Sequence, residues 1–416
     1  MVNFRWEVLA SDNGIASSAI EQLMRRIRMV ARPIYMDNNS TTRVDPRVVE
    51  AMLPYFTDEY GNAASITHSY GARAESAVET AREQVGQLIG CDAKSIIFTS
   101  GATESNNLAL LGVMRAAAAG SHLIINAAEH KAVIDPAKRL EREGFEVTVL
   151  PVDQYGMVAP QSIAASLRPN TVLISVMFAN NEVGSVNPIM EIGAICREAE
   201  VLCHVDATQA VGKIPIDLGS LPVDLLSLSA HKMYGPKGVG ALFVRRGRQR
   251  IKIEPVVYGG GHERGIRSGT LAVQQIVGLG EACRLCQQAM KEEGMQSWSL
   301  RNRLQEGILK LIPDVISNGH PRERLPGNLH LSFRGVNSEA LMTKLKDVVA
   351  VSSGSACTTA EPEPSHVLLA MGIHEDLIDS SIRFGLGRFN TQDEIESVID
   401  AVAHAVTQLR QLVPLR

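Results

Sequence analysis

The feature that most constrains the fold is a regular alternation of short apolar stretches with helical patterns between residues 95 and 244. Each apolar stretch is four or five residues long. Strands that are apolar along their whole length are typical of parallel sheets covered by helices on both faces. We therefore predict an α/β fold with a mostly parallel seven-stranded sheet. Its strands are predicted at residues 95–98, 122–125, 146–149, 172–176, 201–205, 225–228 and 240–244.

The first 33 residues differ from the rest of the chain. Residues 20–30 have the pattern of a basic amphipathic helix. A transit peptide is poor in acidic residues, whereas residues 1–33 contain Glu7, Asp12 and Glu21. We interpret residues 1–33 as a non-catalytic N-terminal extension.

The pattern also changes towards the C terminus. A helical pattern over residues 274–312 is followed by a mixed α and β pattern. We predict a large domain over residues 43–287 and a smaller α+β domain formed by residues 34–42 and 288–416. A strand and a closing helix of the smaller domain are expected at residues 328–333 and 392–409.

Composition and charge argue against several classes of protein. The chain has 416 residues, a net charge of −4 and a pI near 6.3. That balance lacks the basic field that nucleic acids or anionic membranes attract. No apolar run approaches the ~18 residues of a membrane-spanning helix. Six cysteines form no disulfide framework. We expect a cytoplasmic protein without nucleic-acid or membrane partners.

Lys232 follows the strand predicted at residues 225–228. In open α/β sheets, ligands bind outside the carboxyl ends of the strands. A lysine at that position can form a Schiff base with a carbonyl cofactor, of which pyridoxal phosphate is the common one. A lysine in a surface turn explains this stretch better when it is considered alone, but other motifs favour the cofactor.

Two further polar residues follow predicted strands. Asp206 ends the strand at 201–205, where a carboxylate is costly unless it is paired. It could hold the ring nitrogen of the cofactor, with Gln209 donating to the ring hydroxyl; a helix cap is the alternative. His130 follows the strand at 122–125 and could stack on the ring and move protons near neutral pH, although a lone histidine is more often structural.

Three stretches suit anions. Residues 98–106 end a strand and begin a helix, so free backbone N–H groups could bind a phosphate or could simply be capped. Residues 259–270 are rich in glycine and end in Thr270, which could contact a phosphate. Arg383 lies in an apolar strand pattern, and a buried arginine favours a bidentate anion such as a substrate carboxylate.

Cys357 lies in a run of small residues, 352–359, that indicates a loop. A cysteine there is exposed enough to react, and a modest decrease from a pKa of about 8.5 would make it a useful thiolate. The spacing of Cys283 and Cys286 suits zinc, but they lie on a helical pattern without a partner pair, so we predict no metal site. The cysteines that we interpret as packing residues are Cys91, Cys196, Cys203, Cys283 and Cys286.

Together these motifs resemble the cysteine desulfurases of the IscS/NifS type, which are pyridoxal-phosphate enzymes of fold type I. The resemblance runs from about residue 34 to the C terminus. Ser40, Ala63 and Ala230 depart from the usual residues of that family, but none of them replaces a catalytic group. The motifs that carry the resemblance are TSGATES at 99–105, NNE at 180–182, HVDATQ at 204–209, HK at 231–232, RSGT at 267–270 and SSGSAC at 352–357.

The resemblance implies a reaction and a set of site residues. L-cysteine would be converted to L-alanine, while Cys357 takes the sulfur as a persulfide and passes it to an acceptor protein. Lys232 would hold the cofactor and move the Cα proton, and Asn181 and Arg383 would bind the substrate carboxylate. The other implied cofactor contacts are Ala102, Thr103, His130, Asp206, Gln209, Ser229 and His231, with Thr270 reaching across a homodimer.

Several alternatives stay open. The acceptor could serve Fe–S cluster assembly, tRNA thiolation or DNA phosphorothioation, and an Fe–S cluster could bind transiently at Cys357. A selenocysteine lyase or an aminotransferase would share the scaffold, but an aminotransferase needs no thiol. A sulfur carrier that only binds partners would not need Lys232, Asp206 and His130.

Overall fold

The computed structural model describes residues 33–247, 251–353 and 364–412, so the predicted helix at 20–30 and Cys357 lie outside the described residues. Its centre is the predicted seven-stranded sheet, in the order β2-β8-β7-β6-β5-β3-β4. Strand β8 is antiparallel to both neighbours and the other pairs are parallel, which confirms the predicted fold class. The strands are β2 Ile96–Thr99, β3 His122–Asn126, β4 Glu146–Leu150, β5 Thr171–Met177, β6 Leu202–Asp206, β7 Leu225–Ser229 and β8 Gly240–Val244.

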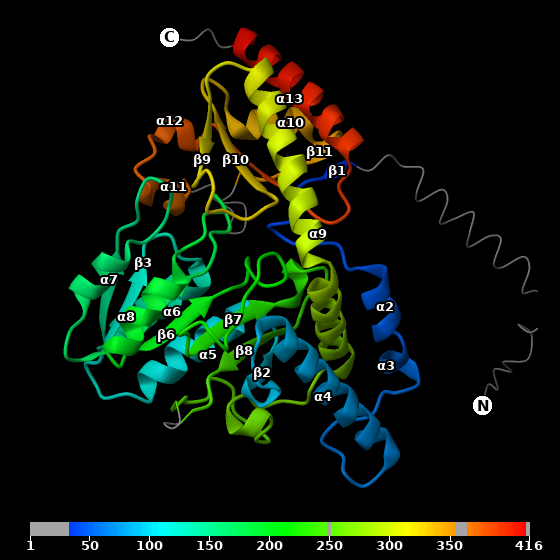
Figure 1. Ribbon diagram of the computed structural model, residues 1–416, viewed down its shortest axis with the longest axis vertical. Helices are drawn as coiled ribbons and strands as arrows, with labels where there is room; N and C mark the ends of the chain where they lie inside the picture. The colour runs from blue at the N-terminus through cyan, green and yellow to red at the C-terminus, as the bar shows by residue number, and fades with distance from the viewer. Residues whose placement is uncertain (1–32, 248–250, 354–363, 413–416) are drawn as a thin grey trace, which may run out of the picture.

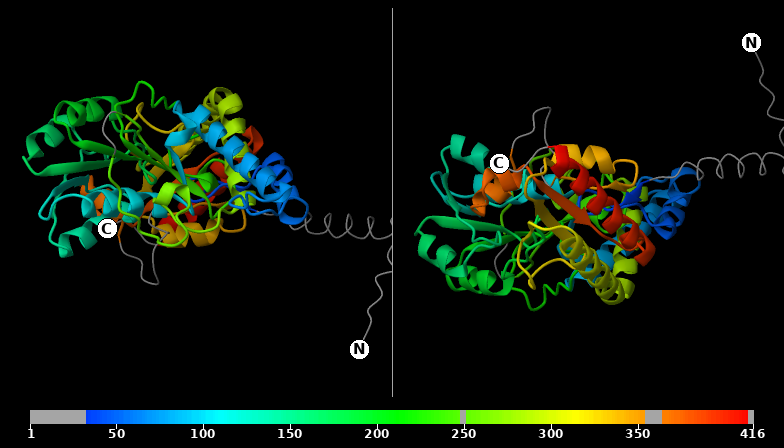
Figure 2. Two further views of the ribbon diagram at one scale, coloured as in Figure 1. Left: turned by 90° about the horizontal axis from the view of Figure 1, so that it is seen from below. Right: turned by 90° about the horizontal axis from the view of Figure 1, so that it is seen from above.

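Helices cover both faces of this sheet (Figures 1 and 2). Side chains alternate between the faces, so Ile96 and Phe98 enter one core and Ile97 enters the other. Burial on both faces explains why the strands are apolar throughout. The helices α5 Ala102–Arg115 and α6 Lys131–Arg142 contribute to one core, and α4 Ser69–Ile89, α7 Pro160–Ser166, α8 Ile189–Glu198 and α9 Val273–Leu311 contribute to the other.

Two smaller sheets lie next to the large one. Strands β12, β10 and β9 form an antiparallel sheet, and β1 pairs with β11 in parallel. Their core is closed by the C-terminal half of α9 and by α13. The bounds are β1 Ile34–Tyr35, β9 Val315–Asn318, β10 Asn328–Phe333, β11 Val349–Ala350, β12 Ser381–Gly385, α10 Ser338–Leu345, α11 His366–Ala370, α12 Glu375–Ile378 and α13 Gln392–Leu412.

Helix α9 belongs to both cores. Ile276 packs in the core of the large sheet, and Leu304 packs in the core of the small sheets. Figure 1 shows the helix running from one to the other. The predicted domain boundary after residue 287 falls inside this helix and stays a prediction.

The sequence pattern predicts one helix over residues 46–55, with Asp45 as its cap and Pro46 at its first position. That prediction is wrong in detail, because two helices form there, α2 Pro46–Met52 and α3 Pro54–Thr57. Pro54 has no N–H to continue the hydrogen-bond ladder, so the first helix ends before it. The expected cap is present, because the Asp45 carboxylate accepts from the Arg47 N–H at 3.0 Å.

Among the described residues, no helix is both long and apolar enough to cross a membrane. The part of the chain that the structure describes also has three short 3₁₀ turns, at Ala93–Ser95, Ala230–Lys232 and Glu263–Gly265.

His204 should make the fold sensitive to acid. Its ring is fully buried in β6, with Nδ1 at 2.8 Å from Ser175 Oγ and Nε2 at 3.0 Å from Ser227 Oγ. Burial lowers the pKa of His204 to about 4. Since the unfolded pKa is about 6.5, the unfolded chain binds a proton first as the pH falls. The stabilisation present above pH ~6.5 is therefore lost as the pH falls towards 4.

We expect the titration of His204 to lower the free energy of unfolding by about 2 kcal/mol when the pH falls from 7.5 to 5. Urea unfolding at the two pH values measures the loss. The control is His204→Asn, which cannot titrate in this range, so its stability should fall less with acid. Equal losses in wild type and variant would contradict the assignment to His204.

Candidate active site

A cavity of about 550 Å³ opens at the carboxyl ends of the parallel strands, where the small sheets meet the large one. Its walls come from segments that are far apart in the sequence, from the turn after β1 to β12. Ten residues that were predicted for the site line it: Ala102, Thr103, His130, Asn181, Asp206, Gln209, Ser229, His231, Lys232 and Arg383.

Lys232 lies in the 3₁₀ turn directly after β7. Its Nζ donates to the carbonyl oxygens of Asn39 at 2.7 Å and Ser40 at 2.5 Å. Two fixed carbonyls orient the amino group at the cavity wall. The turn after β1 therefore holds the residue that the sequence predicted to bind the cofactor.

Asp206 ends β6 and is only 5% exposed. One carboxylate oxygen accepts from Asn106 Nδ2 at 2.8 Å, and the other accepts from Thr208 through its N–H at 3.0 Å and its Oγ1 at 2.5 Å. Donors thus satisfy both oxygens of this buried side chain. The carboxylate is fixed where a cationic ring nitrogen could pair with it.

Sequence reasoning gave no role to Asn106 or Thr208. Asn106 lies four residues after Ala102 in α5, so helical spacing places both on the cavity side. That spacing was the available signal for Asn106. Thr208 follows Asp206 by two residues, a spacing at which side chains commonly bond in turns, but that pattern is not specific to a site.

The N-terminus of α5 forms another wall of the cavity. The helix begins after Gly101, whose φ of +154° suits glycine. Glu104 accepts from the Ser100 N–H at 2.7 Å and from Arg267 Nε at 2.8 Å. Burial opposes ionisation of Glu104, but these hydrogen bonds prevail and lower its pKa. Free N–H groups and the helix dipole make this end of the cavity suitable for a phosphate.

His231 also lines the cavity. Its Nδ1 is 3.1 Å from Thr41 Oγ1. Burial, together with the neighbouring positive charge of Lys232, lowers its pKa to about 4. The imidazole is therefore neutral near pH 7 and can offer one N–H as a hydrogen-bond donor.

His130 is the N-cap of α6 and lines the cavity. Its Nδ1 accepts from the Ala132 N–H at 3.0 Å. The proton of the neutral ring is therefore on Nε2. Burial is the main cause that lowers the pKa of His130; the charge of Lys232 adds to it, while Asp206 opposes it.

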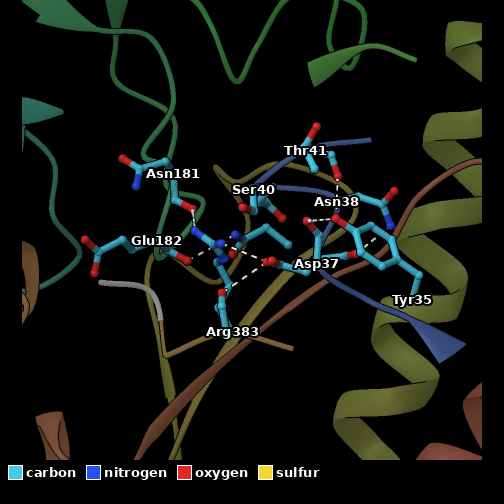
Figure 3. Close-up of polar contacts among 12 residues, drawn as sticks. Tyr35, Asp37, Asn38, Ser40, Thr41, Asn181, Glu182 and Arg383 are labelled. Atoms are coloured by element: carbon cyan, nitrogen blue, oxygen red, sulfur yellow. Dashed lines mark hydrogen bonds and ion pairs between the residues drawn. The ribbon is translucent and has the colours of Figure 1, made fainter. Parts of the chain in front are cut away.

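Arg383 lines the cavity from β12 and is only 2% exposed. Its NH1 donates to the Asn181 carbonyl at 2.8 Å, and its NH2 donates to Asp37 Oδ1 at 2.9 Å (Figure 3). These bonds use two of the five guanidinium N–H groups. The group therefore keeps donors for a carboxylate ligand.

Of the predicted site residues that the structure describes, Thr270 does not line this cavity. Thr270 is exposed, in a loop that Arg267 attaches to Glu104. Cys357 lies outside the described residues. The cavity nevertheless combines a lysine, a buried carboxylate and a helix N-terminus, which are groups that fit the carbonyl, ring nitrogen and phosphate of pyridoxal phosphate.

Comparisons with known proteins agree with this geometry. The family model for class-V aminotransferases matches residues 34–398. Cysteine desulfurase IscS from Anaeromyxobacter sp. (strain K) is 56% identical over 384 residues, which are 92% of this chain and 95% of that protein. A solved NifS-like protein has a TM-score of 0.84 and 36% identity, and the match covers 90% of this chain and 100% of that structure. The structure of SspA in complex with cysteine has a TM-score of 0.76 and 34% identity over 86% of this chain and 100% of its own.

Proposed function

Because this chain belongs to the class-V aminotransferase family, and within it to the cysteine desulfurases, we propose that the described cavity is where it removes sulfur from L-cysteine. The enzyme depends on pyridoxal phosphate. The observation that carries the proposal is the cavity itself, which places Lys232 and Asp206 together with Arg383. The solved structure of SspA in complex with cysteine supports the choice of substrate.

Lys232 is the proposed point of attachment of the cofactor and the base that removes the substrate Cα proton. When bound, pyridoxal phosphate supplies an electron sink for the carbon that loses this proton. Asp206 would pair with the ring nitrogen, and Gln209 and His130, which line the same cavity, would contact the ring. The proposed phosphate contacts are Ala102, Thr103, Ser229 and His231.

The substrate carboxylate is proposed to bind Arg383 and Asn181. Arg383 is a buried cation, and the donors that it keeps suit one carboxylate. This contact would fix the orientation of the amino acid in the cavity.

Sulfur transfer is assigned to Cys357, which lies outside the described residues. Its thiolate attacks the substrate sulfur, and the bond between that sulfur and the substrate Cβ breaks. Cys357 becomes a persulfide. The electron pair stays with the carbon skeleton, which takes up a proton and leaves as alanine.

The function is tested by incubating the purified protein and pyridoxal phosphate with L-cysteine and a thiol reductant. Alanine and sulfide are expected in equal amounts. Pyruvate in place of alanine, or transfer of the amino group without sulfide, would instead place the chain with the other enzymes of its fold.

We also propose a homodimer in which Thr270 of each subunit contacts the phosphate in its partner. In the single chain Thr270 is exposed and does not line the cavity, although its loop is attached to α5 through Arg267 and Glu104. Sedimentation equilibrium is expected to give twice the chain mass of 45.0 kDa. A monomeric and fully active enzyme would contradict the shared site.

The acceptor is proposed to be a protein of Fe–S cluster assembly, tRNA thiolation or DNA phosphorothioation. All the cysteines in the described part of the chain are free thiols, which suits a reducing compartment such as the cytoplasm. Transfer of ³⁵S from L-cysteine to each candidate acceptor identifies the partner, and cell fractionation locates the enzyme.

A further inference from the structure

The four residues 37–40, which follow β1, contact three groups of the proposed site. The Asn39 and Ser40 carbonyls accept from Lys232 Nζ. The Asn39 carbonyl also accepts from Gln209 Nε2 at 2.8 Å. Asp37 contacts the third group, Arg383, through its side chain. Nothing in the reaction proposed above uses Asp37.

The Asp37 carboxylate has two donors on one oxygen. Its Oδ1 accepts from Arg383 NH2 at 2.9 Å and from Ser352 Oγ at 3.1 Å. Ser352 is in turn bonded to the backbone of Arg383, because the Arg383 N–H donates to the Ser352 carbonyl at 2.7 Å. Asp37 is thus held in place by the arginine and by the strand segment paired with it.

This arrangement fixes the plane of the guanidinium group. Asp37 and Asn181 lie on opposite sides of Arg383, and each accepts from a different terminal nitrogen (Figure 3). A planar group that is bonded at two terminal nitrogens cannot rotate about its long axis without losing one of the bonds. The Asn181 acceptor is a neutral carbonyl, whereas Asp37 forms an ion pair with Arg383.

A buried arginine also needs a counter-charge before substrate arrives. Burying an unpaired guanidinium is costly, and Arg383 is only 2% exposed. Asp37 provides a negative charge that does not leave with the product. The side chain of Asp37 is itself 19% exposed, so its charge stays partly solvated.

We propose that Asp37 is a positioning residue that holds the Arg383 guanidinium in the plane in which it receives the carboxylate of L-cysteine. The proposal rests on the role of Arg383 proposed above. It concerns binding of the carboxylate rather than the steps at sulfur. Its effect is therefore expected in KM, with little change in kcat.

The test compares Asp37→Ala and Asp37→Asn with wild type. KM for L-cysteine is expected to rise about tenfold in Asp37→Ala, as for loss of a charged hydrogen bond, while kcat changes less than about threefold. The affinity for L-alanine, measured by titration with the absorbance of the bound cofactor as the signal, should decrease in parallel. Cysteamine, which lacks the carboxylate, should bind all three enzymes equally.

The direction of the change in Asp37→Asn is decisive. If Asp37 merely competed with the substrate for Arg383, removing its charge would tighten L-cysteine binding and overturn the proposal. Weaker binding supports positioning. Loss of the cofactor absorbance in Asp37→Asn would also overturn it, because it would assign Asp37 to the cofactor pocket or to the fold.

Two comparisons separate this inference from the role of Arg383. If Arg383→Ala leaves KM unchanged, the proposed carboxylate site is wrong. If Arg383→Ala raises KM but Asp37→Ala does not, only the positioning role is wrong. In the Arg383→Ala background, Asp37→Ala should have no further effect on KM. The matched control is Tyr35→Phe, which removes a hydroxyl bonded to the Asp37 and Thr41 carbonyls without touching the carboxylate, and its KM should match wild type.

Discussion

Replacing Lys232 with alanine is expected to abolish turnover of L-cysteine, lowering kcat by at least about 10³-fold. The variant loses both the amino group that attaches the cofactor and the base at the substrate Cα. In the wild type, Lys232 Nζ is held in the cavity by the Asn39 and Ser40 carbonyls, an arrangement that alanine cannot reproduce. The fold should be retained, since Lys232 lies in a turn after β7 and not in a strand.

Borohydride reduction followed by peptide mass analysis provides the direct measurement. In wild type, the mass of the cofactor should stay on the peptide that contains Lys232. The control is Lys213→Met, which removes a lysine bonded to Gln209 at 2.9 Å. Its cofactor should still be attached covalently at Lys232. Covalent cofactor on Lys232→Ala would show that the attachment site is wrong.

Replacing Cys357 with serine is expected to abolish sulfide release while the absorbance of the bound cofactor is unchanged. A serine hydroxyl cannot accept sulfur as a persulfide, so the substrate would bind and lose no sulfur. Persulfide labelling of the protein after mixing with L-cysteine should likewise disappear. A rate of sulfide release close to that of wild type would remove Cys357 from the reaction.

Cys91 offers a matched control for this variant. Of the five cysteines in the described part of the chain, Cys91 is partly exposed and the other four are buried. Burial raises its pKa to about 12, with a further contribution from Asp92, so its thiolate is scarce near pH 7. Cys91→Ser should release sulfide at the rate of wild type.

The sheet could be predicted because its strands are buried on both faces and are therefore apolar along their whole length. The same logic located Asp206, Lys232 and His130, since each follows a strand and parallel strands end at one edge. The single helix predicted over residues 46–55 was wrong because the helical pattern continues across Pro54. Pro54 has no N–H to donate, so the chain forms two helices there.

The contacts of residues 37–40 could not be predicted in this way. Asp37 and Arg383 are 346 residues apart, and no periodicity connects a turn after one short strand with the middle of another. Their meeting depends on how the small sheets are placed against the large one. A sequence pattern reports local burial, whereas this contact is decided by tertiary packing.

The pairing of β1 with β11 also has a consequence for synthesis of the protein. The seven strands of the large sheet have all been made once residue 244 leaves the ribosome, but β11 and β12 follow more than a hundred residues later. Until then the Asn38 N–H has no Gly385 carbonyl to bond, and the turn that holds Lys232 lacks its anchor. A nascent chain should therefore bury its first core early and acquire the ability to retain pyridoxal phosphate only near the end of translation.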